Sequence, residues 1–270
     1  MLRKHLKHLL VSLLVPLAAA LASTSARATD YTDLWYTASE SGQGYNVVQS
    51  DNFLFITFFI YGPDKQPTWV SAQLTLDNTG NYNGGLYKTQ GTYYALPWNN
   101  ADHPPAQQVG TASFQPSTAN AYQATLVYTV NGVGTIVKPI ERQNLTDITV
   151  AGSYVGGQSG AYSQCNSSAN NGSYIDTFSL LGITQTTANV ATLTFSYDSG
   201  ANCTLSGPLE QHGTLYRIAN ASYACTGSIV LNANAVVFEF KATSLGIEGR
   251  FSAPLSGGCR EDAQFSGVLR

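Results

Sequence analysis

Apolar and polar side chains alternate with a period of two along much of the chain. Between Tyr122 and Val130 every second residue is apolar or aromatic, whereas Gln123, Thr125 and Thr129 lie on the opposite face. The same alternation recurs at residues 191–197, 236–241 and 247–251. It is typical of β-strands with one face in a hydrophobic core and the other in water. Beyond the first 28 residues no stretch of comparable length has apolar residues at helical spacing, so the sequence predicts an all-β protein.

Turn residues divide the first half into eight predicted strands. They cover residues 33–37, 44–50, 53–61, 67–76, 82–89, 107–115, 121–130 and 133–142. Asn131-Gly132, between the last two, is the favoured pair for a two-residue hairpin turn. The second half, from about Ala151, contains six to eight more predicted strands with the same alternation and with turn residues between them. Strands joined in sequence by short turns suit a barrel or a sandwich with meander connections, because closure removes exposed strand edges.

A polar segment without a strong pattern, Gln143–Thr149, separates the two halves. We therefore predict two small antiparallel β-domains, one at residues 29–148 and one at residues 149–270. A membrane-spanning barrel is the architectural alternative, since Phe53–Tyr61 is apolar and long enough to cross an outer membrane. Most other strands carry Thr, Asn or charge where a lipid-facing surface would need apolar residues. A buried central strand is therefore the favoured interpretation of this run.

The first 28 residues have the features of a cleavable export signal. Three basic residues precede an apolar stretch at residues 9–21, and Ala26-Arg27-Ala28 offers small residues where a signal peptidase cuts. The apolar stretch is short for a transmembrane helix, and no later segment replaces it. The mature chain is therefore expected to begin near Thr29, to be exported and to contain no transmembrane segment. Periplasm, cell surface and extracellular space remain open as destinations, and a retained N-terminal anchor is the alternative.

Removal of this segment makes the chain more acidic. The whole sequence has 13 Lys and Arg against 16 Asp and Glu, a formal net charge of −3. Four of the basic residues (Arg3, Lys4, Lys7 and Arg27) belong to the predicted signal, so 9 remain against 16 and the net charge becomes −7. A nucleic-acid-binding protein needs a cluster of basic residues to neutralise phosphates, and the sequence after residue 28 has none. Nucleic acid is therefore not an expected partner.

All four cysteines, Cys165, Cys203, Cys225 and Cys259, lie in the second half. In an exported chain they are expected to form two disulfides, for which three connectivities are possible. Cys203 and Cys225 flank a predicted turn at His212-Gly213 almost symmetrically, so an antiparallel hairpin would place them side by side. Cys165 and Cys259 would then join the beginning of this half to its end. Zinc is the competing interpretation, but the sequence lacks C-x-x-C spacing, so we expect neither a metal nor another cofactor.

The mature sequence is poor in groups that carry out catalysis. Its two histidines, His103 and His212, lie in a predicted loop and a predicted turn, and no serine lies in a G-x-S-x-G elbow. Paired carboxylates could hydrolyse glycosidic bonds without histidine. The candidates are Asp51, Asp64, Asp77, Glu141, Glu210, Glu239 and Glu248. Because most of them lie at turns or on polar strand faces, we expect no catalytic residues, with a carboxylate-dependent polysaccharide hydrolase as the alternative.

The aromatic residues are a stronger indication of function than the candidate catalytic groups. The chain has 16 Tyr and 3 Trp, and all three tryptophans lie in the first half. Trp35 and Trp69 lie in predicted strands and are expected in the core. Tyr and Trp combine an apolar ring with a polar group, which suits stacking on sugars or lining a mixed pocket. The predicted ligand-binding residues are those of one loop, Tyr93, Tyr94, Trp98 and Asn99.

Several short motifs of the first half occur in the order found in a bacterial exported β-domain. They include Leu34-Trp35-Tyr36, Ser41-Gly42-Gln43-Gly44-Tyr45, Pro67-Thr68-Trp69 and Tyr128-Thr129-Val130-Asn131-Gly132. Residues 33–143 resemble this recurring module of unestablished function, although Gln43 and Lys65 stand where it often has Trp and Gly. The resemblance implies an extracytoplasmic bacterial setting and assigns no catalytic residue. The second half is similar to lipocalin- and avidin-like carriers in architecture alone, which does not imply function.

Together these features predict an exported, non-enzymatic binding protein. The expected partner is a glycan or an amphipathic small molecule, held by aromatic side chains near one end of the first domain. The alternatives are the hydrolase and a structural or inhibitory protein that docks another protein through an exposed strand edge.

Overall fold

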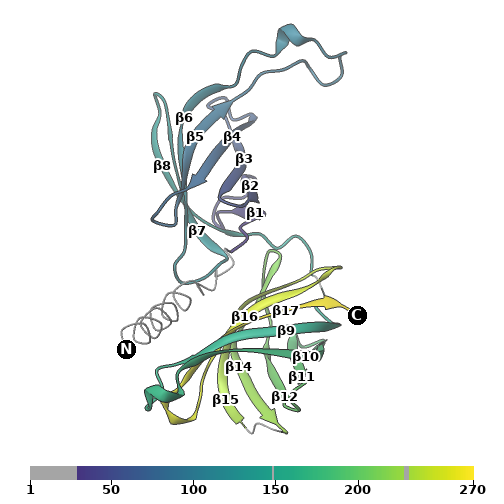
Figure 1. Cartoon of the computed structure of the whole chain (residues 1–270). Helices are drawn as coiled ribbons and strands as arrows, with labels where there is room; N and C mark the ends of the chain where they lie inside the picture. Colours follow the sequence, from purple (N-terminus) through teal and green to yellow (C-terminus); the bar gives the residue numbers. More distant parts are fainter. Residues whose placement is uncertain (1–28, 148, 228–230) are drawn as a thin grey trace, which may run out of the picture. The chain divides into compact units, whose positions relative to one another are not determined.

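The strands of the chain form two closed β-barrels. The computed structural model describes residues 29–147, 149–227 and 231–270, and over these residues the chain has 17 strands and three short 3-10 helices (Figure 1). Each barrel consists of eight antiparallel strands. The predicted all-β class is confirmed, and the strands close into barrels and not sandwiches. The predicted signal, residues 1–28, lies outside the described residues.

The first barrel is an up-and-down meander. Its strands are β1 (Asp33–Tyr36), β2 (Gly44–Ser50), β3 (Phe53–Tyr61), β4 (Pro67–Leu76), β5 (Tyr82–Lys88), β6 (Gln107–Pro116), β7 (Gln123–Val130) and β8 (Gly134–Arg142). Each strand pairs with the next one in sequence, and β1 also pairs with β8, which closes the barrel. The predicted two-residue turn at Asn131-Gly132 is a three-residue loop, because Val130 pairs with Gly134. Gly132 has a φ of 78°, a conformation that glycine adopts without strain.

Large side chains fill the first barrel. Trp35, Tyr45, Phe58 and Phe114 are buried there. Their rings meet edge to face, with centroids 5.3 Å apart for Trp35 and Phe114 and 5.2 Å apart for Tyr45 and Phe58. This geometry is the favourable one for neighbouring aromatic rings, so the interior of this barrel is packed core. Trp35 is 0% exposed, as expected for a core residue.

Two expectations about the first barrel are wrong. Phe58 and the other inward residues of β3 are buried, but Phe53, Phe55 and Phe59 are exposed on its outer face, so the strand is not buried on both sides. Trp69 on β4 faces Phe59 across the ladder and is 51% exposed instead of lying in the core. Each strand of a closed barrel has one face inside and one outside. Position in the alternation, and not hydrophobicity, therefore decides which of these rings are buried.

The second barrel is also a meander, with one extra short strand. Its strands are β9 (Gly152–Ser163), β10 (Gly172–Gln185), β11 (Val190–Tyr197), β12 (Asn202–Pro208), β13 (Glu210–His212), β14 (Leu215–Thr226), β15 (Leu231–Ala242), β16 (Gly246–Pro254) and β17 (Arg260–Leu269). β9 pairs with β17 and β12 pairs with β14, which closes eight strands, while β13 pairs with the beginning of β14. The predicted turn at His212-Gly213 lies at the tip of this long hairpin, where Gly213 has a φ of 62°.

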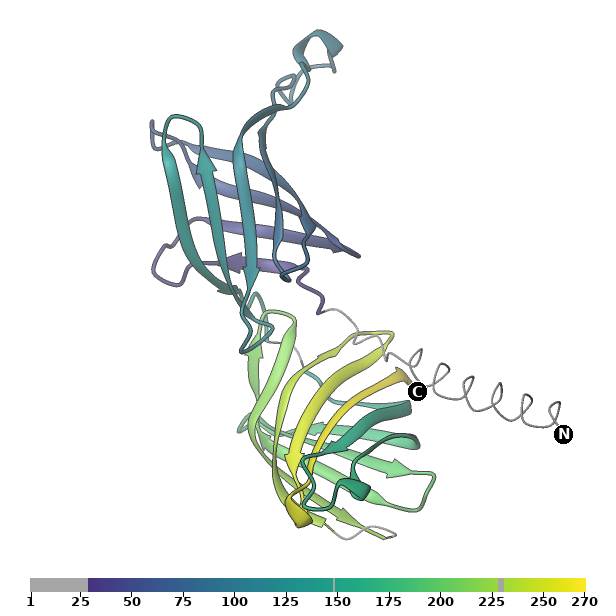
Figure 2. The same cartoon turned by 60° about the vertical axis from the view of Figure 1, so that its left-hand side comes forward.

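The connections between strands carry the three 3-10 helices. η1 (Asn100–Asp102) lies in the long β5–β6 connection, which projects beyond the strands of the first barrel (Figures 1 and 2). η2 (Ser168–Asn170) and η3 (Ser256–Gly258) lie at one end of the second barrel (Figure 2). In the described part of the chain no helix has the length and apolar character needed to cross a membrane. The division into domains at residues 29–148 and 149–270 stays a prediction, and residue 148 lies outside the described part.

Candidate functional site

A cavity of about 470 Å³ lies at the end of the second barrel that carries η2 and η3. Small molecules are commonly bound in cavities of about 300 to 1,000 Å³. The described residues that line it are Gln158, Tyr162, Asn170, Tyr174, Ile175, Asp176, Tyr197, Cys203, Tyr223, Cys225, Leu231, Leu255, Ser256, Cys259 and Glu261. Strands β9, β10, β11, β12, β14, β15 and β17 all contribute, so the cavity is built by the ends of most strands of this barrel.

Period-two alternation aims the polar residues of the cavity into the barrel. On β17 Glu261 shares the buried face with Phe265, whereas the intervening Asp262 is exposed. On β9 Gly160 makes room for a neighbouring ring, because a Cβ at this position would lie 2.7 Å from the phenol ring of Tyr174. The glycine thus leaves the space that the Tyr174 ring occupies beside the cavity.

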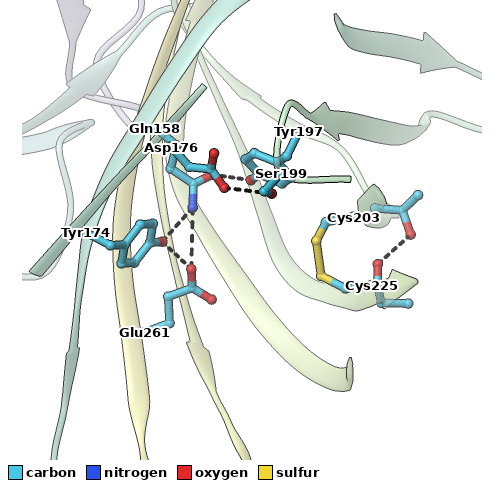
Figure 3. Close-up of a disulfide and its surroundings, with 10 residues drawn as sticks. Gln158, Tyr174, Asp176, Tyr197, Ser199, Cys203, Cys225 and Glu261 are labelled. Atoms are coloured by element: carbon cyan, nitrogen blue, oxygen red, sulfur yellow. Dashed lines mark hydrogen bonds between the residues drawn. A yellow bond between two sulfur atoms is a disulfide. The ribbon is translucent and has the colours of Figure 1, made fainter. Parts of the chain in front are cut away.

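Five polar side chains form one network at the base of the cavity, and Figure 3 shows Gln158, Tyr174, Tyr197 and Glu261 of this network. Glu261 Oε1 accepts a hydrogen bond from the Tyr174 phenol and lies 3.4 Å from Gln158 Nε2. Gln158 Nε2 also donates to the Tyr174 oxygen over 2.6 Å, and Gln158 Oε1 accepts from the Tyr197 phenol over 2.5 Å. The Tyr223 phenol is a further hydrogen-bond partner of Glu261. We call these five residues the Glu261 network; it joins β9, β10, β11, β14 and β17.

Glu261 brings a buried carboxyl group to this network, and no basic side chain pairs with it in the part of the chain that the structure describes. The residue is 3% exposed, and the described residues that line the cavity include no Lys, Arg or His. Burial raises the pKa of the Glu261 carboxyl above its ordinary range, although hydrogen bonds from Tyr174 and Tyr223 act in the opposite direction. Burial prevails because a carboxylate removed from water loses hydration that neutral hydrogen-bond donors replace only in part.

The tyrosines around Glu261 are neutral hydrogen-bonding groups at physiological pH. Burial raises the pKa of the Tyr174, Tyr197 and Tyr223 phenols, and the charge of Glu261 acts in the same direction. Tyr162, whose ring stacks on Tyr174 with centroids 4.9 Å apart, has a raised pKa for the same two reasons. Because an ordinary tyrosine already titrates near pH 10, these rings keep their protons well above neutrality.

Both disulfides border the cavity. Cys203 and Cys225 are directly opposite each other in the β12–β14 ladder and are bonded. Cys165 and Cys259 join the β9–β10 connection to the β16–β17 connection. This is the connectivity that the hairpin argument favours. The two bridges therefore cross-link different strands and connections around the cavity.

The part of the cavity nearer to solvent is lined by both apolar and polar side chains. Leu231 and Leu255 are half-buried there, Ile175 is 86% exposed, and Asn170 and Ser256 are exposed polar residues. The cavity thus has hydrogen-bonding and ionisable groups at its base and several aliphatic side chains nearer to solvent, an arrangement that suits an amphipathic molecule.

Sequence reasoning did not identify this site, although one signal for it exists. In the alternating run Arg260–Phe265, Glu261 occupies the same face as Ala263 and Phe265, and a charged residue on the apolar face of a strand is unusual. Tyr174 and Gln158, however, are separated from Glu261 by 87 and 103 residues. Only the barrel closure brings them together.

The predicted ligand-binding residues lie in the β5–β6 connection of the first barrel. Tyr93, Tyr94 and Trp98 are 59%, 90% and 72% exposed. The rings of Tyr93 and Tyr94 contact each other, with centroids 4.7 Å apart. His103 stacks on one face of the Trp98 indole with a centroid distance of 3.5 Å. This loop therefore presents exposed aromatic rings at a distance from the strands.

Asn99 has a structural role in the same loop. Its Oδ1 accepts a hydrogen bond from the Ala101 N–H over 3.1 Å, and its Nδ2 lies 3.3 Å from Asp102 Oδ1. Asp102 also accepts a hydrogen bond from the Thr92 hydroxyl over 3.0 Å. These contacts join η1 to Thr92, at the beginning of the β5–β6 connection.

Several of the candidate catalytic carboxylates take part in local contacts. Asp77 accepts a hydrogen bond from the Thr79 N–H over 2.7 Å, and Glu239 forms an ion pair with Arg250. Glu210 lies 3.4 Å from Arg217. These contacts are those of turns and polar strand faces. In the described residues no group of three or more His, Cys, Asp or Glu is placed to hold a metal ion.

The raised pKa of Glu261 predicts a pH-dependent stability. The folded state holds this proton to a higher pH than the unfolded chain does, so stability falls as the pH rises from the ordinary carboxyl pKa of about 4.3 through the raised value. We expect Glu261→Gln to remove that part of the fall, so that the melting temperatures of the variant and the wild type diverge in the variant's favour towards neutral pH. Melting curves at several pH values test this.

Asp262→Asn is the matched control for that experiment, because Asp262 is the exposed neighbour of Glu261 and pairs with Arg260 at 3.0 Å. Exposed ion pairs contribute little to stability, so this variant is expected to follow the wild type. Parallel curves for wild type and Glu261→Gln would contradict the assignment.

Comparison with known proteins gives a distant structural neighbour and no function. No family model and no curated protein matches the chain. The crystal structure of a protein of unknown function from the DUF3598 family of Nostoc punctiforme PCC 73102 is similar over 88% of this chain and 93% of its own, with 9% identity and a TM-score of 0.27. Like the module that residues 33–143 resemble, this neighbour brings no assigned activity.

Proposed function

We propose that this is an extracytoplasmic binding protein whose second barrel holds a small amphipathic molecule. The observation that carries the proposal is the cavity of about 470 Å³, with the Glu261 network at its base and the aliphatic side chains of Ile175, Leu231 and Leu255 nearer to solvent. Two disulfides support the setting, because such bonds persist in oxidising compartments outside the cytosol.

Closure of the strands favours this function over docking through a strand edge. Each of the eight strands of both barrels has partners on both sides, and the additional strand β13 has three residues. A partner that adds a strand needs a longer free edge than this. A molecule bound inside the barrel requires no free edge.

Blocking the cavity mouth tests the proposal. Ser256 is exposed and lines the cavity, so Ser256→Trp is expected to add bulk at the mouth without disturbing the core. Ligand-observed NMR with a library of small soluble fragments should find molecules that bind the wild type and no longer bind the Ser256→Trp variant.

Ser167→Trp is the matched control, since Ser167 is exposed beside η2 at the same end of the barrel and does not line the cavity. It is expected to bind the same fragments as the wild type. Absence of fragment binding to the wild type, or equal binding to Ser256→Trp, would contradict the proposed function.

The exposed aromatic loop of the first barrel is a second candidate, for contact with glycans. Its basis is the exposure of Tyr93, Tyr94 and Trp98, since uncovered rings of this kind stack on sugars. Trp98→Ala is expected to abolish binding to those glycans of an array that the wild type retains, whereas Trp69→Ala, at a tryptophan of 51% exposure on β4, should have no effect. An unchanged array profile for Trp98→Ala would show that the loop is not the contact.

A further inference from the structure

Among the described residues, only neutral groups donate hydrogen bonds to the Glu261 carboxyl. Tyr174, Tyr223 and Gln158 supply hydrogen bonds, and none of them carries a positive charge. Hydrogen bonds from neutral donors spread the charge of a carboxylate without neutralising it. A buried carboxylate is far more stable beside a cation, because opposite charges within a few ångström interact strongly where water is excluded.

The cavity offers further groups that suit a positive charge on an organic molecule. Asp176 lines it as a second carboxyl group, and four tyrosines, Tyr162, Tyr174, Tyr197 and Tyr223, surround the base. Aromatic rings attract ammonium groups through their electron-rich faces, and phenol oxygens accept hydrogen bonds from them. Aliphatic side chains at the rim, including Ile175, suit an apolar chain or ring attached to such a group.

We propose that the cavity of the second barrel selects an organic ammonium ion with an apolar body, and that Glu261 is its counter-ion. This inference rests on the proposed function and specifies the ligand class of the same site. The ammonium group lies against the Glu261 carboxylate at the base, and the apolar body extends past Leu231 and Leu255 to the mouth. Neutral or anionic molecules of the same shape cannot form an ion pair with the Glu261 carboxylate.

Binding of such a cation depends on the ionisation of Glu261. Affinity is expected to fall as the pH drops through the pKa of this carboxyl, and the fall begins at a higher pH than for an ordinary glutamate because burial raises that pKa. The phenols of Tyr162, Tyr174, Tyr197 and Tyr223 face the same carboxyl from β9, β10, β11 and β14 and do not titrate in this range. The other carboxyls near it are Asp176, on β10, and the outward-facing Asp262, which pairs with Arg260.

Three probes of equal chain length test the inference on the mature full-length protein: hexylamine, 1-hexanol and hexanoate. Calorimetry or NMR titration at neutral pH is expected to show hexylammonium binding about tenfold or more tightly than hexanol, the gain typical of a hydrogen bond between charged groups. Hexanoate should bind most weakly. Glu261→Gln should remove the difference between hexylammonium and hexanol, and the matched variant Asp262→Asn should keep it.

The outcomes separate the ligand class from the proposed function. Equal affinity for hexylammonium and hexanol in the wild type overturns the counter-ion role and leaves the cavity as a binding site. Absence of binding by all three probes overturns both. If Glu261→Gln does not fold, the pH titration of the wild type decides: a fall in affinity at acidic pH for hexylammonium but not for hexanol supports the inference, and parallel profiles overturn it.

Discussion

Replacing Cys165 and Cys259 by alanine is expected to lower the free energy of unfolding of the second barrel by about 4 to 5 kcal/mol. The bridge joins positions 94 residues apart, and a cross-link over so long a loop removes much of the conformational freedom of the unfolded chain. The loss is a large fraction of the stability of a small domain, which is commonly about 5 to 15 kcal/mol. Urea unfolding followed by peptide-resolved hydrogen exchange would report on this barrel separately.

Cys203 and Cys225 provide an internal comparison for that experiment. Their bridge spans 22 residues, for which the same chain-entropy argument gives about 3 kcal/mol. Both residues are buried, so their replacement by alanine also changes packing around the cavity. A reducing agent applied to the wild type should reproduce the combined loss of both bridges. An unchanged unfolding midpoint in the Cys165→Ala/Cys259→Ala variant would show that the native loops are held without the bridge.

Much of the architecture can be predicted from the alternation of apolar and polar residues and from the turn residues between strands. Strand ends in the first barrel lie within two residues of those predicted, because alternation defines a strand and turn residues such as Asp51 and Gly132 define where it stops. Asp51 and Gly132 both have positive φ, the conformation that ends a strand in a tight turn. Cys203 and Cys225 lie at similar distances in sequence from the turn at His212-Gly213. An antiparallel hairpin pairs residues at similar distances from its turn, so the sequence alone places the two cysteines opposite each other.

Closure is what the local pattern leaves undetermined. The sequence of a strand such as Phe53–Tyr61 does not say whether its second face meets another layer or water, so it predicts a core position for phenylalanines that the structure exposes. The Glu261 network has the same origin, because its members come from five strands that become neighbours only when β9 pairs with β17 and β12 with β14. A site of this kind requires the barrel before it can be recognised.

The second large effect on stability is expected from a substitution of Trp35, in the core of the first barrel. We expect Trp35→Ala to destabilise this barrel by about 3 to 5 kcal/mol, the usual result of removing a buried aromatic side chain. The indole is 0% exposed, its Nε1 donates to the Tyr31 carbonyl over 3.0 Å, and its ring packs edge-on against Phe114. Because β1 has only four residues and closes the barrel against β8, loss of this anchor should weaken closure as well as packing.

Trp69→Ala is the matched control, since it removes the same side chain from the outer face of the same barrel. With half of its surface exposed, Trp69 contributes cross-strand contact with Phe59 and little burial, so a loss of about 1 kcal/mol or less is expected. Urea-dependent hydrogen exchange of peptides from β1, β2 and β8 measures both variants in the same strands. Similar losses for the two tryptophans would mean that the outer aromatic face of β3 and β4 is covered in solution and that Trp69 is buried there.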